Sequence, residues 1–157
     1  MLTTTRRAAL SASLAAGLAL AGAGAAVAAP PADAGRSLST TLTPDDEVAP
    51  FVGLAGATGQ ADLSLNIGQR RICVDLRTSG FDLTLAHIHE AAPGTNGPVV
   101  VDFTSLISGD TAAGCVTVDR ALVKEISKNP ADYYVNTHAG APGTAEFFQG
   151  IRGQLGD

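Results

Sequence analysis

Basic residues are scarce in this chain and never form a run longer than Arg70-Arg71. The 157 residues carry 10 Lys and Arg against 15 Asp and Glu, which gives a formal net charge of −5. A surface that binds a polyanion needs clustered positive charge. The composition therefore argues against nucleic-acid binding and against attachment to anionic lipid.

Several catalytic signatures are also absent. The sequence has no serine nucleophile elbow, no CxxC pair, no HExxH and no Walker motif, so the corresponding hydrolase, redox, protease and nucleotide-binding classes have no support. It has no tryptophan, only 4% aromatic residues and no repeat of fixed period. Whether the protein is an enzyme stays open at this point, and a non-catalytic protein is favoured.

The N-terminus has the layout of a secretory signal peptide. Arg6-Arg7 precede an almost uncharged run of Ala, Leu and Gly, and small residues end at Ala28. We predict a signal peptide over 1–28, using either the general secretory or the twin-arginine route, and a secreted or extracytoplasmic mature protein. Loss of the two arginines leaves 8 basic and 15 acidic residues, a net charge of −7. No second apolar segment follows, so we expect no membrane insertion of the mature chain.

The remaining residues predict a flexible lead-in over 29–39 and one domain over 40–157. Short runs with alternating or β-branched apolar residues, separated by Gly, Pro, Asn and Asp, are typical of strands. Asp119 is placed to cap one short helix, which Asn129-Pro130 ends. The predicted fold class is mainly β: an antiparallel β-sandwich or Greek-key barrel with one short helix.

Cys73 and Cys115 are the only cysteines, and an even count in an exported chain predicts a disulfide. Each cysteine has the opposite parity from the apolar residues of its strand. The bridge is therefore expected on a face away from the main core, or at an edge. The alternatives are two separate thiols or two metal ligands.

Only three histidines occur, and His87 and His89 share one predicted strand. Side chains alternate between the two faces of a strand, so both imidazoles point the same way. Phe81, Leu83 and Leu85 have the same parity. We therefore expect the two histidines to extend the inward, apolar face near one end of the sandwich core.

His138 ends a later predicted strand and would join the other two if the strands are neighbours. Three histidines form a zinc or copper set that leaves one coordination position open. The alternative is a metal-free polar cluster, because an unpartnered buried imidazole is costly. The residues expected to support such a cluster are Glu90, Asn96, Asn136 and Arg152.

Three further segments carry predictions. Arg152 is expected to pair with a carboxylate, Glu90 or Glu146, although an exposed edge position would also suit it. The acidic run 45–47 is interpreted as a solvated turn. Phe147-Phe148 form either an exposed contact site or a cover over the end of the sandwich.

Four motifs, in this order, resemble the CHRD domain, the module named for its repeats in chordin, over Leu38 to Leu155. They are Leu42–Pro50, Ala86-His87-Ile88-His89 followed by Asn96–Val100, Asn129–His138, and Ile151-Arg152-Gly153-Gln154-Leu155. The chain departs from the family pattern in Glu90-Ala91-Ala92, where a glycine is usual, and in the insertion over 144–149.

The resemblance implies an extracellular β-rich module and no established reaction. It favours a non-catalytic binding or structural module, with an extracellular protein or glycan as the expected ligand class. The alternative is a copper or zinc protein that uses His87, His89 and His138. The His-Ile-His-Glu segment resembles a strand of copper/zinc superoxide dismutases, which would imply redox or dismutase-like activity, but the other ligand motifs of that family are missing.

Overall fold

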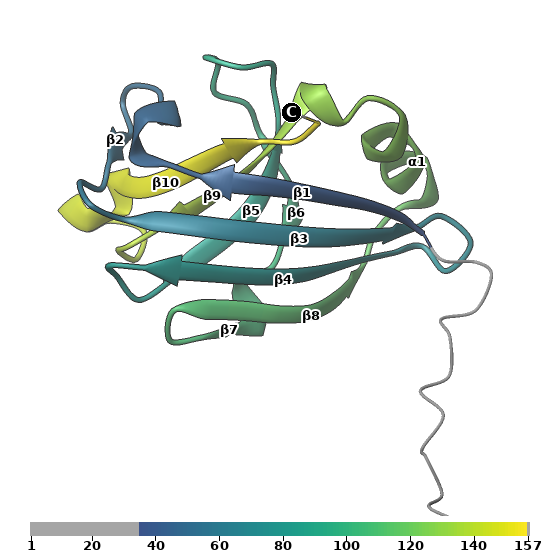
Figure 1. Ribbon diagram of the computed structural model, residues 1–157, viewed down its shortest axis with the longest axis horizontal. Coiled ribbons are helices and arrows are strands. Elements are labelled where there is room, and N and C mark those ends of the chain that lie inside the picture. Colours follow the sequence, from purple (N-terminus) through teal and green to yellow (C-terminus); the bar gives the residue numbers. More distant parts are fainter. Residues whose placement is uncertain (1–34, 157) are drawn as a thin grey trace, which may run out of the picture.

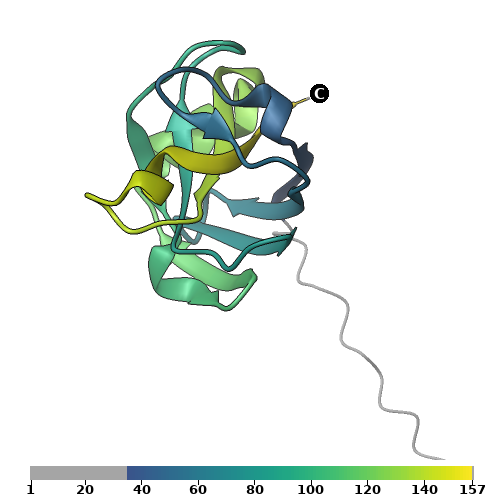
Figure 2. The same cartoon turned by 90° about the vertical axis from the view of Figure 1, so that its left-hand side faces the viewer.

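The computed structural model describes residues 35–156, so the predicted signal peptide and most of the predicted lead-in lie outside the described residues. Two five-stranded sheets face each other (Figures 1 and 2). The strand order is β1-β3-β4-β8-β7 in the first sheet and β2-β10-β9-β5-β6 in the second. The fold is a β-sandwich, the first of the two predicted architectures.

The first sheet is entirely antiparallel. The second is antiparallel except where β2 pairs in parallel with β10. The strands are β1 (Arg36–Leu42), β2 (Val52–Gly53), β3 (Thr58–Asn66), β4 (Arg71–Ser79), β5 (Leu85–Glu90), β6 (Val99–Asp102), β7 (Ile107–Ser108), β8 (Thr111–Thr117), β9 (Tyr133–His138) and β10 (Gln149–Gln154).

The first strand begins earlier than predicted. β1 starts at Arg36, which pairs with Leu65, so residues 36–39 of the predicted lead-in belong to the sheet. Their Ser-rich sequence concealed a regular alternation in which Leu38, Thr40 and Leu42 are buried. The prediction that the domain starts at residue 40 relied on the polar composition of this segment and was therefore four residues too late.

The alternation of apolar and polar residues along the strands places the apolar side chains in the core, as predicted. Leu63 and Leu65 in β3 and Ile72, Val74 and Leu76 in β4 all face the second sheet. Burying the side chain of one such aliphatic residue stabilises the fold by about 1.5–3 kcal/mol.

The predicted helix is α1 (Arg120–Lys128), and the Asp119 side chain accepts a hydrogen bond from the amide of Ala121. Val123 and Ile126 of α1 pack into the core. Residues 35–156 also contain four 3₁₀ segments: η1 (Pro44–Asp46), η2 (Thr104–Leu106), η3 (Pro130–Asp132) and η4 (Ala145–Phe148).

The predicted disulfide is confirmed. Cys73 on β4 and Cys115 on β8 are direct cross-strand partners, and their sulfur atoms are bonded. Both lie on the outer face of the first sheet, because their neighbours Ile72 and Val74 point into the core. The parity of the cysteines in the sequence therefore identified the face correctly.

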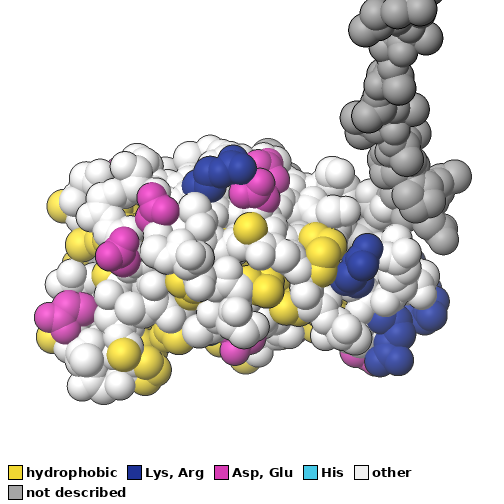
Figure 3. Space-filling model, turned by 90° about the horizontal axis from the view of Figure 1, so that it is seen from below, with side chains coloured by type: hydrophobic (Ala, Val, Ile, Leu, Met, Phe, Trp, Pro, Cys, Tyr) yellow, Lys and Arg dark blue, Asp and Glu magenta, His cyan; other side chains and the backbone are white. Residues whose placement is uncertain are grey.

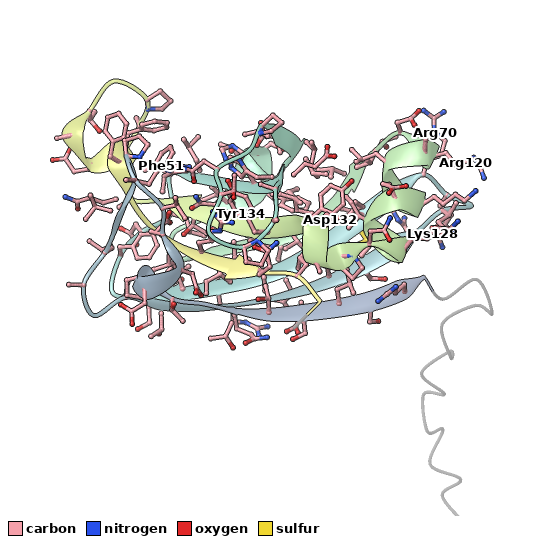
Figure 4. All side chains as sticks on the ribbon, turned by 90° about the horizontal axis from the view of Figure 1, so that it is seen from above. Phe51, Arg70, Arg120, Lys128, Asp132 and Tyr134 are labelled. Carbon is pink, nitrogen blue, oxygen red and sulfur yellow. A yellow bond between two sulfur atoms is a disulfide. The ribbon has the colours of Figure 1, made fainter. Side chains whose placement is uncertain are left out.

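Basic side chains gather at the end of the sandwich that carries α1. Arg70, Arg120 and Lys128 lie there together (Figure 4), and Figure 3 shows Lys and Arg atoms at the end from which the chain enters β1. Asp132 lies close by, so the charge of this end is mixed. No histidine is visible on the face shown in Figure 3.

We predict that Cys73→Ala/Cys115→Ala lowers the free energy of unfolding by about 3–4 kcal/mol, because the bridge closes a loop with a sequence separation of 42. Urea unfolding of the oxidised protein and of the double variant measures the difference. Equal midpoints would show that the bridge does not constrain the unfolded chain.

Candidate metal centre

His87 and His89 lie on the outer face of the second sheet. In β5, the residues that join the hydrophobic core are Ala86 and Ile88. The prediction that the histidines extend the inward apolar face is therefore wrong. Both imidazoles are nevertheless buried, because loops cover this outer face.

The error has a local cause. Leu83 is in the core, but the next core residue is Ala86, three positions later rather than two. β5 begins only at Leu85, and the amide of Leu83 bonds the carbonyl of Gly109 outside any named strand. The alternation that starts at Phe81 is thus interrupted, and the side chains of β5 follow the opposite parity.

Pairing between β5 and β9 brings the third histidine to the same place. His89 is the partner of Tyr134, His87 of Asn136 and Leu85 of His138. One potential ligand atom from each histidine lies within 4.8 Å of the other two. The three side chains are almost closed to solvent, with 9%, 8% and 3% exposure for His87, His89 and His138.

Two of the three imidazoles donate a ring N–H to a backbone carbonyl. His89 Nδ1 donates to the carbonyl of Gly97 at 2.9 Å, and His138 Nδ1 donates to the carbonyl of Phe147 at 2.7 Å. A carbonyl only accepts, so both Nδ1 atoms carry the hydrogen and both Nε2 atoms present a lone pair. His89 Nε2 is buried without a hydrogen-bond partner.

His87 is oriented in the opposite way. Its Nε2 lies 3.6 Å from Asp102 Oδ1 and 3.4 Å from Thr104 Oγ1, and its Nδ1 is buried without a partner. The carboxylate of Asp102 favours the hydrogen on Nε2, which leaves a lone pair on Nδ1. Asp102 and Thr104 had no recognisable signal in the sequence, because β6 and η2 reach the histidine only through sheet pairing.

Three loop segments cover this outer face. The 91–98 loop supplies the Gly97 carbonyl, the 139–148 segment supplies Phe147, and the 47–51 segment supplies Phe51. A side chain at Gly97 would place its Cβ 1.9 Å from the carbonyl oxygen of Glu90, so only glycine permits this approach. Phe51 and Tyr134 lie on the side of the second sheet away from β1 (Figure 4).

Aromatic stacking extends along the buried face. The ring of His89 stacks on Tyr134 with centroids 4.8 Å apart, and that of His138 stacks on Phe147 at the same distance. Phe51 contacts His138 edge-on at 5.4 Å, while Phe148 remains 43% exposed. Phe147 therefore covers His138, and Phe148 forms the exposed part of the predicted tip.

Arg152 is buried and pairs with neither predicted carboxylate. Its guanidinium lies 3.4 Å from the ring centre of Tyr134 and donates to the carbonyls of Thr95 and Ala92 and to Gln154 Oε1. Burial lowers its pKa from the ordinary value. The prediction of a pair with Glu90 or Glu146 is wrong; the side chain holds the 91–98 loop on the sheet instead.

The remaining predicted support residues divide into two groups. Asn136 is 1% exposed and lies among the histidines, and Asn96 donates to the carbonyls of Val48 and Ala49, which ties two covering loops together. Glu90 is exposed at the end of β5 and does not enter the group.

Glu47 belongs to the site although the sequence suggested a solvated turn. Asp45 and Asp46 are exposed as expected, but Glu47 turns inward, and its Oε2 lies 3.5 Å from Asn136 Nδ2. Its Oε1 is buried without a partner. Its position directly after two exposed acids gave no sign of this, because burial depends on how η1 packs against β10.

Burial also sets the protonation of the group. Desolvation lowers the pKa of His87 to about 4, and it lowers those of His89 and His138 below their ordinary value. Desolvation raises the pKa of Glu47 to about 7. The imidazoles are thus neutral at pH 7, which is the form that binds a metal ion.

The fold and this site define a two-sheet β module with a buried three-histidine cluster under loops. The sequence profile of the CHRD domain matches residues 38–155, and the chain belongs to this family. No curated protein and no solved structure matches the chain significantly. Within the described residues, no helix has the length and apolar character needed to span a membrane.

We predict that Glu47→Gln stabilises the protein at pH 8 by about 1–2 kcal/mol in the presence of a chelator. With a folded pKa of about 7, the native state of the wild type loses stability as pH rises from 4.5 through 7, and glutamine has no charge to bury. The full shift corresponds to about 3 kcal/mol, which partial solvation reduces.

Urea unfolding at pH 8 and pH 4 tests this prediction, with the exposed Asp45→Asn as control. The gain should vanish at pH 4, where both forms of residue 47 are neutral. A gain of equal size at both pH values would exclude ionisation as its cause.

We also predict that Arg152→Lys lowers the free energy of unfolding by about 2–3 kcal/mol. Lysine keeps the charge but cannot stack on Tyr134 while bonding two loop carbonyls. The matched control is Arg77→Lys, because Arg77 forms an exposed pair with Asp75 and should change stability by less than about 0.5 kcal/mol. Equal losses for the two variants would contradict this role of Arg152.

Proposed function

We propose that the protein is an exported, non-catalytic binding module and that its ligand is a transition-metal ion, zinc or copper, held by His87, His89 and His138. The disulfide and the CHRD family both fit an extracytoplasmic location. The predicted signal peptide supplies the export route, general secretory or twin-arginine.

The observation that carries the proposal is that the buried cluster contains more hydrogen-bond acceptors than donors directed at them. His87 Nδ1 and the Nε2 atoms of His89 and His138 are the ring nitrogens without a fixed outer partner, and two of them are buried with no hydrogen-bond partner at all. Neutral imidazoles whose hydrogens face outward cannot satisfy one another. A metal cation binds all three lone pairs at once.

The outer hydrogen bonds match what a metal-binding histidine needs. Such a histidine commonly donates its second ring N–H to a carboxylate or a backbone carbonyl, which fixes the tautomer and the ring orientation. Here the carbonyls of Gly97 and Phe147 accept from His89 and His138, and the Asp102 carboxylate lies 3.6 Å from His87 Nε2.

The spacing of the rings supports the same ligand. Two nitrogens that bind one ion at about 2.1 Å can be at most about 4.2 Å apart. The three ligand atoms lie within 4.8 Å of one another, so small ring movements bring them onto a common ion. Both cysteines are in the disulfide, which leaves an imidazole set suited to zinc or copper.

A metal-free polar cluster explains the site less well. That arrangement requires hydrogen bonds to both nitrogens of each ring, or a cost of about 1–3 kcal/mol for each buried nitrogen without one. The hydrogen bonds of nearby donors lead elsewhere: those of Arg152 to the 91–98 loop and that of Asn136 to Glu47.

We predict near-stoichiometric zinc or copper in protein purified without a histidine tag, measured by elemental analysis. His87→Gln/His138→Gln should abolish uptake of Zn²⁺ and Cu²⁺ in calorimetric titrations and leave the circular dichroism spectrum unchanged. Asp45→Asn, in the exposed acidic turn, is the control and should bind normally.

Two results would contradict the proposal. One is a wild-type protein that contains no metal and takes up neither ion after dialysis against chelator. The other is a double variant that unfolds while the wild type binds nothing, which would support the metal-free cluster instead.

A further inference from the structure

Asn136 occupies the centre of the buried outer face. Its Cα pairs with His87 on β5 and with Arg152 on β10, and it shares its face with His138, two residues further along β9. Directly opposed side chains on one face of a sheet have Cβ atoms about 4.5–5.5 Å apart. Asn136 is therefore the residue that β9 places beside two of the three histidines.

One side-chain hydrogen bond orients its amide. The carboxylate oxygen Oε2 of Glu47 lies 3.5 Å from Nδ2 and accepts from it, so Oδ1 points away from Glu47. That oxygen is buried and has no hydrogen-bond partner.

The hydrogen bonds of the neighbouring donors lead to other acceptors. His89 and His138 direct their N–H groups to loop carbonyls, and Nε2 of His87 faces Asp102. The hydrogen bonds of Arg152 go to Thr95, Ala92 and Gln154. The amide oxygen thus adds one more unsatisfied acceptor to the three imidazole lone pairs.

We propose that Oδ1 of Asn136 is the fourth ligand of the ion, completing a three-nitrogen, one-oxygen set; this inference rests on the proposed function. Four ligands give the tetrahedral arrangement that zinc adopts in closed sites. Glu47 is a positioning residue, because its carboxylate holds Nδ2 and so turns Oδ1 toward the histidines.

The oxygen ligand also defines the class of ion. Carbonyl oxygens suit harder divalent ions, whereas the soft Cu(I) ion prefers thiolate and thioether ligands. Within the described residues both cysteines are oxidised, so no thiolate is available. The site therefore selects a divalent ion, Zn²⁺ or Cu²⁺, over Cu(I).

The experiment uses Co²⁺ as a spectroscopic substitute for Zn²⁺, titrated into metal-free protein. Asn136→Leu removes the oxygen ligand, Asn136→Asp replaces it with a charged one, and Glu47→Gln tests positioning. The matched control is Thr137→Val, the next residue of β9, which points to the opposite face and whose hydroxyl bonds the carbonyl of Ile151. Visible absorption reports the ligands around cobalt, and competition with a chelator gives the affinity.

We expect Asn136→Leu to weaken Co²⁺ binding about 10–100-fold and to change the visible bands. Asn136→Asp should bind at least about tenfold more tightly, and Glu47→Gln should weaken binding while keeping the band positions. Thr137→Val should match the wild type in both measurements.

Wild-type affinity and bands in a folded Asn136→Leu would overturn the fourth-ligand assignment and leave the three-histidine site intact. If the leucine variant fails to fold, Asn136→Asp tests the assignment instead. A Co²⁺ affinity and visible bands equal to those of the wild type would then exclude direct contact between residue 136 and the ion. A wild-type protein that binds neither Co²⁺ nor Zn²⁺ would overturn the proposed function, and this inference with it.

Discussion

A polar sheet face buried under loops is the constraint on which this structure depends. Many antiparallel sheets leave one face in water, but every residue of β9 is buried. Polar side chains on its outer face must therefore find partners within the protein. Gln154 shows the pattern: its Nε2 lies 2.7–3.0 Å from the carbonyls of Ala91, Ala131 and Tyr133.

The same solution recurs across that face and holds the covering segments, which contain no strand paired along this face, against the sheet. The sheet side chains Arg152, His89 and His138 each donate a hydrogen bond to the backbone carbonyl of a covering segment. An irregular loop has backbone groups that no neighbouring strand satisfies, and the side chains of the sheet satisfy them. One consequence is that the N–H groups of His89 and His138 are used outward, which leaves their Nε2 lone pairs in the interior.

The regular parts of the fold were predictable because they depend on neighbours in the sequence. Alternation in β3 and β4 identified the core face, the parity of Cys73 and Cys115 identified the face of the bridge, and Asp119 marked the start of α1. The CHRD motifs add the family, which the profile match over 38–155 confirms.

The site was only partly predictable because it depends on contacts that sequence periodicity does not contain. The interruption between Leu83 and Leu85 reversed the face of the histidines, although their mutual parity was correct. The partner of Arg152 is backbone, which no residue type reveals. Glu47 looked like Asp45 and Asp46 in the sequence, and only the packing of η1 against β10 distinguishes it.

The sandwich is braced differently in its two layers. The first sheet is locked covalently by Cys73 and Cys115 on its outer face, while the second relies on loops held by Arg152, Gln154 and the histidines. Reducing agents and chelators would then act on opposite halves of the molecule. Under the proposed function, loss of the ion would leave the disulfide-bridged first sheet intact, as a template on which the loops of the second sheet would reassemble once an ion returns.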